Sequence, residues 1–131
     1  IPGIIIACPS AGDDAAMMLR EAHRLAREEQ RVVVFVEPIA LYPMRDLADA
    51  GDGGWMRHYP APDRRIGLGE VGVSGEGADL AIVSYGNGHY LSQQAARDLA
   101  EAGVDTRVID LRWLAPLPEA ALIEAIGIGP C

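Results

Sequence analysis

Residues 78–110 read "ADLAIVSYGNGHYLSQQAARDLAEAGVDTRVID" and contain two apolar runs with a helical pattern between them. The first run, 78–86, ends in glycine, and the helical pattern stops at Gly103, as helices commonly do. The next strand is predicted in "TRVIDLRWL", 106–114, and a further helix in "PLPEAALIEAI", 116–126, has proline near its first turn. Two strands joined by a helix form a β-α-β unit with parallel strands. This stretch therefore predicts an α/β fold.

An earlier part of the chain has the same plan. The segments "GIIIAC", 3–8, and "RVVVFVEP", 31–38, are largely apolar at consecutive positions, which is typical of parallel strands buried on both faces. A helix is predicted between them, with Ser10 and Asp13 at the spacing of a capping box. The residues expected on its buried face are Ala15, Met18, Leu19, Ala22, Leu25 and Ala26.

The middle of the chain, 40–77, mixes proline, glycine and charged residues with Trp55, Met56 and Tyr59. This composition indicates a connector that packs against other parts of the protein. Within it, "IGLGEVGVSGEG", 66–77, is compatible with a short hairpin. Since such a connector cannot serve as a crossover within one sheet, the two β-α-β units are expected in different sheets.

The formal net charge is −8, and the eleven basic residues are all arginines, scattered along the chain. This charge repels a phosphate backbone, so nucleic acid is not expected as a partner. No apolar run approaches the ~20 residues that cross a bilayer, and the N-terminal sequence lacks the basic lead-in of a signal peptide, so neither a membrane nor export is expected. Cys8 and Cys131 have no metal-ligand or disulfide-framework spacing, which fits a reducing cytoplasm.

The glycines before the second helix raise the question of a nucleotide site. A dinucleotide fingerprint reads G-x-G-x-x-G, but Gly86 and Gly88 are followed by Leu91 in place of the third glycine. Asp110 lies at the distance of the acidic residue that binds a ribose, although strands commonly end in a polar residue. A plain strand-to-helix turn is therefore favoured over a nucleotide site. The "GDG" at 51–53 is likewise interpreted as a turn.

Four segments carry a resemblance to a known family. They are "PGIIIACPS" (2–10), "VVVFVEPIALY" (32–42), "ADLAIVSYG" (78–86) and "AARDLAEAGVDTRVIDLRWLAPL" (95–117). In this order they resemble the beta subunit, or fused beta region, of the thiamine-diphosphate-dependent decarboxylating component of 2-oxo acid dehydrogenase complexes, in the transketolase-like superfamily. The resemblance runs from Pro2 to Ile126 and is most specific in "VIDLR" followed by L-x-P-L.

The resemblance implies the end of a pyrimidine-binding domain in 1–42, an interdomain connector in 43–77 and the start of a transketolase C-terminal-like domain in 78–131. It also implies that the chain is a fragment of an enzyme. The family's activating glutamate and its active-site histidine, in a His-Ser-Gln segment, lie upstream of the residues that match Pro2 and Gly3. No catalytic, cofactor-binding or metal residue is therefore assigned in this chain.

From the same resemblance, the intact enzyme is expected to decarboxylate a 2-oxo acid, of the pyruvate or branched-chain type, with thiamine diphosphate and magnesium, and to acylate a lipoyl group. The fragment alone is expected to bind no cofactor and to be inactive. The implied partners are another E1-type subunit or region and the lipoyl acyltransferase core, in a homo- or hetero-oligomer. In the full enzyme, neighbouring domains or subunits are expected to bury Trp55, Tyr59 and Trp113.

Two alternatives remain open. A fragment of a transketolase or a deoxyxylulose phosphate synthase is the competing enzyme, although Glu37 and Pro38 stand where those relatives tend to carry an arginine-rich sequence. The other alternative is a non-catalytic α/β module for docking or oligomerisation.

Many beta subunits of this family bind potassium in a loop before the second strand. The resemblance places Glu28 and Gln30 at the aspartate and asparagine of that loop, and their oxygens suit a hard cation. A solvated helix end in "REEQR", 27–31, is nevertheless favoured. His23 and His58 have no second ligand at metal spacing.

Overall fold

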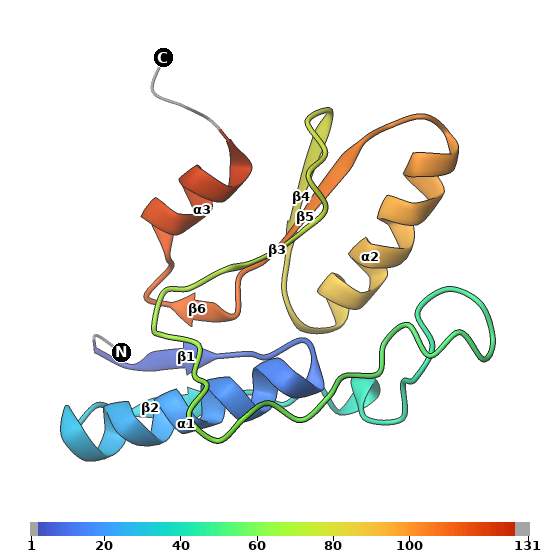
Figure 1. Cartoon of the computed structure of the whole chain (residues 1–131). Coiled ribbons are helices and arrows are strands. Elements are labelled where there is room, and N and C mark those ends of the chain that lie inside the picture. The colour runs from blue at the N-terminus through green and yellow to red at the C-terminus, as the bar shows by residue number, and fades with distance from the viewer. Residues whose placement is uncertain (1–2, 128–131) are drawn as a thin grey trace.

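The computed structural model describes residues 3–127, which form two small β-sheets with helices packed against them (Figure 1). The strands are β1 (Ile5–Ala7), β2 (Val33–Phe35), β3 (Gly72–Ser74), β4 (Leu80–Ser84), β5 (Thr106–Asp110) and β6 (Trp113–Ala115), and the helices are α1 (Gly12–Glu28), α2 (Gly86–Glu101), α3 (Glu119–Ile126) and a short 3₁₀ helix, Ile39–Leu41. One sheet has the strand order β2-β1-β6 and the other has β3-β5-β4. The α/β fold class and the placement of the two β-α-β units in different sheets are confirmed.

The first sheet and α1 enclose the main core. β1 and β2 are parallel, with Ile5 opposite Val33, and Ile5, Met18 and Trp113 have no exposed surface. The expectation that the second strand is buried on both faces is wrong, because Val34 is 45% exposed. Among the described residues, β2 ends the strand order and α1 covers only one of its faces.

The buried face of α1 differs from the predicted one. Leu19 is 55% exposed and Ala26 is exposed, while Asp14 and Glu21 turn inward. Each of these two carboxylates is paired with an arginine, and this pairing makes their burial tolerable. The predicted residues that are buried are Met18, Ala22 and Leu25.

The second sheet does not contain the predicted hairpin. β4 and β5 are parallel, as expected, and β3 pairs antiparallel with β5, with Gly72 opposite Asp110. The backbone after β3 runs so close to β5 that a Cβ at Gly77 would lie 2.2 Å from the Thr106 amide nitrogen. After a turn at 67–70, residues 72–77 therefore lie along β5, and segment 66–77 does not form a hairpin.

The predicted strand 106–114 is broken in the middle. β5 ends at Asp110, Arg112 has a φ of +58°, and the chain then continues as β6. β6 pairs antiparallel with β1 in the first sheet, where Trp113 is buried in the core. A strand that follows the second unit thus completes the first sheet. The family resemblance, which implied two separate domains, did not predict this exchange.

The connector packs against the rest of the molecule, as predicted. The Arg20 guanidinium on α1 donates hydrogen bonds to the carbonyls of Pro60, Ala61 and Arg64 at 2.6–3.2 Å. It also lies over the Tyr59 ring, 5.3 Å from the centroid. Ile66 then enters the core. One arginine therefore fixes the path of the connector along α1.

An earlier part of the connector is attached to α2. The Tyr90 hydroxyl donates to the Asp46 carbonyl at 2.9 Å, and the Gln94 amide donates to the Leu47 carbonyl at 2.6 Å. Trp55 packs edge-on against the Tyr90 ring at 5.0 Å. The connector thus contacts both units, through α1 and through α2.

Two of the three aromatic residues expected to be buried in the full enzyme are already buried within this chain. Trp55 is 5% and Trp113 is 0% exposed. Tyr59 is 81% exposed here, and its burial by a neighbouring domain or subunit stays a prediction. None of the helices within residues 3–127 has both the length and the apolar character needed to cross a bilayer.

We expect Arg20→Ala to lower the free energy of unfolding by about 1 kcal/mol, because three connector carbonyls lose a charged donor. It should also speed proteolysis within residues 58–65. Urea unfolding and limited digestion with mapped cleavage sites measure both effects. Arg27→Ala is the matched control, since Arg27 is an exposed arginine of α1 with no side-chain hydrogen bond among the described residues. Equal behaviour of the two variants would contradict the assignment.

Candidate functional site

Polar residues from both units meet in one buried place. The loop after β1, the first turn of α1, the start of α2 and the end of β5 converge there. We call Ser10, Asp14, Gly86, Asp110 and Arg112 the junction cluster. Ser10, Asp14 and Asp110 are all buried, with Asp14 the most exposed of the three at 7%. This buried polar cluster, which joins both units, is the candidate site.

Ser10 does not cap its own helix, so the predicted capping box with Asp13 is wrong. The N-cap of α1 is Ala11, with no side-chain hydrogen bond. The Ser10 hydroxyl accepts the Gly86 amide at 2.8 Å and donates to Asp110 Oδ1 at 2.9 Å. The first amide of α2 is therefore satisfied by a side chain from the other unit.

Gly86 is required by geometry. Its φ is +53°, and a Cβ there would lie 3.3 Å from Cys8 Sγ. Its amide, which in a nucleotide site would point to a phosphate, is bonded to Ser10. Asp110, the candidate ribose ligand, accepts a hydrogen bond from the same hydroxyl. These contacts support the interpretation of a strand-to-helix turn.

Arg112 and Asp14 form the ionic part of the cluster. Arg112 Nε and Nη2 donate to the two carboxylate oxygens of Asp14 at 2.9 and 3.0 Å. Burial raises the pKa of Asp14, and the Arg112 guanidinium opposes this shift. A Cβ at Gly72 in β3 would lie 2.9 Å from the guanidinium carbon, so the absence of a side chain there leaves room for Arg112.

Burial shifts the pKa of two acidic groups at the cluster, the Asp110 carboxyl group and the neighbouring Cys8 thiol. Burial raises the pKa of Asp110, and burial together with the nearby Asp110 raises the pKa of the Cys8 thiol. A thiol of raised pKa is a poor nucleophile, so Cys8 is suited to packing rather than covalent chemistry. Cys131 lies outside the described residues.

His89, on α2, is held neutral at neutral pH. Burial lowers its pKa to about 4, and its ring packs against Trp55 with 6.0 Å between the centroids. Nε2 lies 3.3 Å from the Gln93 amide nitrogen, and Nδ1 has no partner among residues 3–127. A neutral imidazole is here part of the packing between α2 and the connector.

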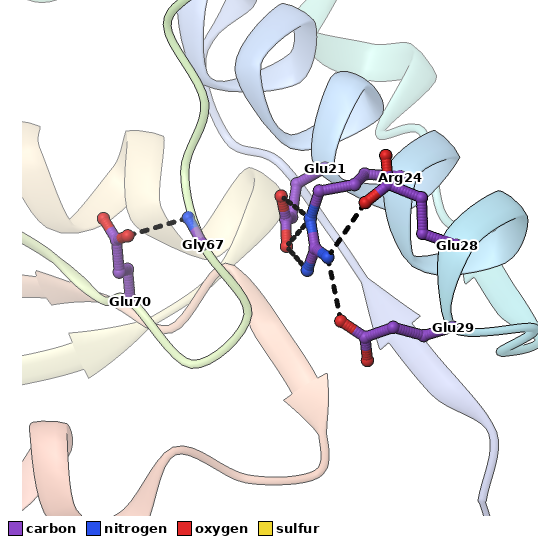
Figure 2. Close-up of polar contacts among 6 residues, drawn as sticks. All are labelled: Glu21, Arg24, Glu28, Glu29, Gly67 and Glu70. Carbon is purple, nitrogen blue, oxygen red and sulfur yellow. Dashed lines mark hydrogen bonds and ion pairs between the residues drawn. The ribbon is translucent and has the colours of Figure 1, made fainter.

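The end of α1, where potassium binding was considered, is organised by Arg24. Figure 2 shows its guanidinium among Glu21, Glu28 and Glu29, at 2.6, 3.6 and 2.9 Å. In the same view, Glu70 accepts the Gly67 amide of its own turn.

The last turn of α1 is closed by its own backbone. Gln30 has a φ of +53°, and the Arg31 amide returns to the Leu25 carbonyl, as in a helix C-terminal cap. These contacts favour the solvated helix end, while cation binding by Glu28 and Gln30 stays a prediction. His23 and His58 are both exposed. No group of three or more His, Cys, Asp or Glu side chains gathers into a metal-type cluster within the described part of the chain.

The "GDG" at 51–53 is a turn, as predicted. The Asp52 carboxylate accepts hydrogen bonds from the amides of Leu47, Ala48, Asp49 and Gly54 at 2.7–2.9 Å. These amides hold the pKa of Asp52 well below its usual range. The aspartate that a magnesium-diphosphate motif would need free is engaged by its own loop.

A groove of about 480 Å³ opens beside the cluster, the size of a small-molecule site. It lies between the start of α1 and the connector, and it is lined chiefly by apolar side chains with Glu37, Tyr42 and Arg57 among them. The Tyr42 hydroxyl donates to Glu37, and this bond raises the pKa of Tyr42. Glu37 and Pro38, the two residues that were weighed against the transketolase and deoxyxylulose phosphate synthase alternative, both line the groove.

Sequence reasoning assigned no site residue and missed the junction cluster. Asp14 gave a signal, since it precedes Met18 by one helical turn and so lies on the face that carries the core. Arg112 gave a weaker one, as a charge directly after a buried strand. The ion pair between these two residues could not be predicted from local sequence patterns, because they lie 98 positions apart.

Residues 69–127 match the family described as "Transketolase, C-terminal domain". The chain is 32% identical over 125 residues to the pyruvate dehydrogenase E1 component subunit beta of Bacillus subtilis, covering 95% of this chain and 34% of that protein. It is 32% identical over 124 residues to the 2-oxoisovalerate dehydrogenase subunit beta of the same organism, with 95% and 34% covered. It is also 30% identical to the acetoin:2,6-dichlorophenolindophenol oxidoreductase subunit beta of Cupriavidus necator, with 96% and 33% covered.

A solved structure is also similar, the "Split gene transketolase, inactive beta4 tetramer". Its TM-score is 0.64 and its sequence identity 25%, covering 98% of this chain and 37% of that one. The chain thus spans about a third of the length of the proteins that it matches.

We expect Ser10→Ala to lower the free energy of unfolding by about 1–3 kcal/mol, because it leaves the Gly86 amide and Asp110 buried without their shared partner. Urea unfolding measures the loss. Ser74→Ala is the matched control, since the Ser74 hydroxyl makes no hydrogen bond among the described residues. A loss at Ser10 no larger than that at Ser74 would show that the junction contributes no stability.

Proposed function

Since residues 69–127 belong to the transketolase C-terminal domain family and the chain is related to beta subunits of 2-oxo acid dehydrogenases, we propose that it is part of such a beta subunit or fused beta region. The observation that carries this proposal is the extent of the similarity. It covers 95% of the chain, including both sheets and the connector, and not only the family match at 69–127.

Within that protein, we propose the domain boundaries inferred above: 1–42 in a pyrimidine-binding domain, 43–77 as connector and 78–131 in the C-terminal domain. The structure adds two qualifications. β3 precedes position 78 but pairs with β5, and β6 follows it but pairs with β1. A strand of the connector therefore belongs to the second sheet, and a strand of the second unit belongs to the first sheet. The proposed boundaries mark changes in amino-acid composition along the chain.

The proposed reaction of the intact enzyme is decarboxylation of a 2-oxo acid, followed by acylation of the lipoyl group of an acyltransferase partner. Thiamine diphosphate, with magnesium, supplies the group that stabilises the carbanion left by decarboxylation. The described residues do not fit that cofactor, because Asp52 is bonded to its own loop and the α2 amide at Gly86 is bonded to Ser10. This chain's role is structural: it fixes two domains against each other.

The proposed partners are another E1-type subunit or region and the lipoyl acyltransferase core, in the cytoplasm. The exposed side chains of Val32, Val34 and Val36 support a subunit contact on the outer face of β2, because an uncovered apolar strip of this kind marks an interaction surface. An oligomer also agrees with the similar solved structure, which is a beta4 tetramer.

The second candidate is a transketolase, favoured by that same solved structure, which is a split gene transketolase. Against it, Glu37 and Pro38 line the groove just after β2, where transketolases and deoxyxylulose phosphate synthases tend to carry an arginine-rich sequence. Arg57 is the only basic residue among the groove's lining residues. A carboxylate at this place disfavours a sugar phosphate.

We expect the complete protein, combined with its alpha subunit, to reduce 2,6-dichlorophenolindophenol in the presence of a 2-oxo acid, thiamine diphosphate and magnesium. Pyruvate, a branched-chain 2-oxo acid and acetoin should be compared, because the related beta subunits are named for these substrates or their complexes. Omission of thiamine diphosphate is the control. Ketol transfer between sugar phosphates without dye reduction would favour the transketolase alternative.

We expect this chain alone to give only heats of dilution when thiamine diphosphate and magnesium are titrated into it in a calorimeter. The reason is that neither Asp52 nor the first amide of α2 is free for a diphosphate or its metal. The assembled enzyme, titrated in the same buffer, is the positive control. Saturable binding by the chain alone would show that a cofactor site has been misplaced.

A further inference from the structure

The two carboxylates of the junction cluster have unequal partners. Asp14 is held by two hydrogen bonds from the Arg112 guanidinium, at 2.9 and 3.0 Å. Asp110 is bonded through Oδ1 only, to the Ser10 hydroxyl at 2.9 Å and to the Arg112 amide at 3.4 Å. Its Oδ2 has no partner within residues 3–127, although Asp110 is only 2% exposed. The cluster thus holds one more carboxylate than its single guanidinium neutralises.

The titratable and charged groups around Asp110 come from the loop after β1, from α1, from α2 and from the segment after β5, while β3 and β4 place Gly72 and Ser84 opposite it. The Cys8 thiol follows β1, Asp14 lies on α1 and Arg112 lies between β5 and β6. His89, on α2, faces Asp14 and Arg112. Of these, Asp14 repels a charge on Asp110, and Arg112 attracts it. Because Arg112 is already paired with Asp14, it compensates Asp110 only in part.

We propose that Asp110 is a proton-operated latch between the two sheets. With a proton from solvent on its carboxyl group, the junction is closed and carries no uncompensated charge. When that proton returns to solvent, the buried negative charge, which Arg112 compensates only in part, favours opening of the junction to water. Opening separates Ser10 from Gly86 and loosens α2 from the first unit. This inference does not depend on the proposed enzyme activity.

The expected pH dependence follows from burial. Burial raises the pKa of Asp110 in the folded chain, so the closed junction binds the proton more tightly than the open one. The junction is then most stable below the ordinary pKa of an aspartate, and this stability is lost as pH rises through the raised value. Each unit of difference in pKa corresponds to about a tenfold change in the opening equilibrium.

His89 contributes with the opposite sign. Its pKa is lowered to about 4, so its contribution to stability is present above the ordinary histidine pKa and is lost as pH falls. Global unfolding therefore mixes the two effects, and the latch requires a local readout. The Gly86 amide provides one, because it donates directly to Ser10.

The test is hydrogen exchange of the Gly86 amide in this chain, followed by NMR between about pH 4 and about pH 7.5 and corrected for the intrinsic exchange rate at each pH. We expect protection to fall by about tenfold or more across this range, since the opening equilibrium follows the proton on Asp110. In Asp110→Asn, which keeps an acceptor for Ser10 without a charge, protection should stay nearly constant. Asp98→Asn, a change at an exposed aspartate of α2, should behave as the unaltered chain.

Constant protection in the unaltered chain, or an equal fall in Asp110→Asn, would overturn the proposal. Should Asp110→Asn not fold, the carboxyl carbon resonance of Asp110 in the unaltered chain decides. A titration above the ordinary aspartate pKa supports the latch. A titration at or below that value rejects it.

Discussion

One hydroxyl group joins the two halves of this protein. Ser10 Oγ bonds a backbone amide 76 residues away and a carboxylate 100 residues away. A serine hydroxyl has one proton and two lone pairs, so it can accept and donate at once. The close approach that these contacts require leaves no room for a side chain at position 86, and beside them a glycine at position 72 leaves room for the Arg112 guanidinium.

The distribution of charge follows a single rule in a chain whose net charge is −8. Within residues 3–127, carboxylates are buried only where a hydrogen-bond donor meets them. Arg112 pairs with Asp14, Arg24 pairs with Glu21, and the Ser10 hydroxyl donates to Asp110. Such pairs add little net stability, because desolvation offsets their attraction, but a single lost partner is costly. They specify which surfaces of the two units face each other, while Ile5, Met18 and Trp113 supply the apolar burial.

The sequence predicted the local elements better than their long-range arrangement. Both β-α-β units, the end of the second helix before Gly103 and the separation into two sheets follow from apolar runs and glycine or proline positions. The break between β5 and β6 could not be predicted, because it depends on Trp113 finding the core of the other unit. The role of Ser10 was misassigned for a related reason: its spacing to Asp13 satisfies a local rule, and a distant amide competes successfully for the same oxygen. At the candidate site, the sequence shows the polar residues themselves, but it does not show which distant residues they bind.

The return of β6 to the first sheet has a consequence for how the chain could be divided. The two units are covalently joined through the connector, but they are also joined by a strand that one unit supplies to the other. A break in the connector would therefore yield two polypeptides of complementary shape. One would lack the third strand of its sheet, and the other would carry that strand with Trp113 ready to refill the core. The single chain is thus built from two pieces that complement each other's structure, as the fragments of a split protein do.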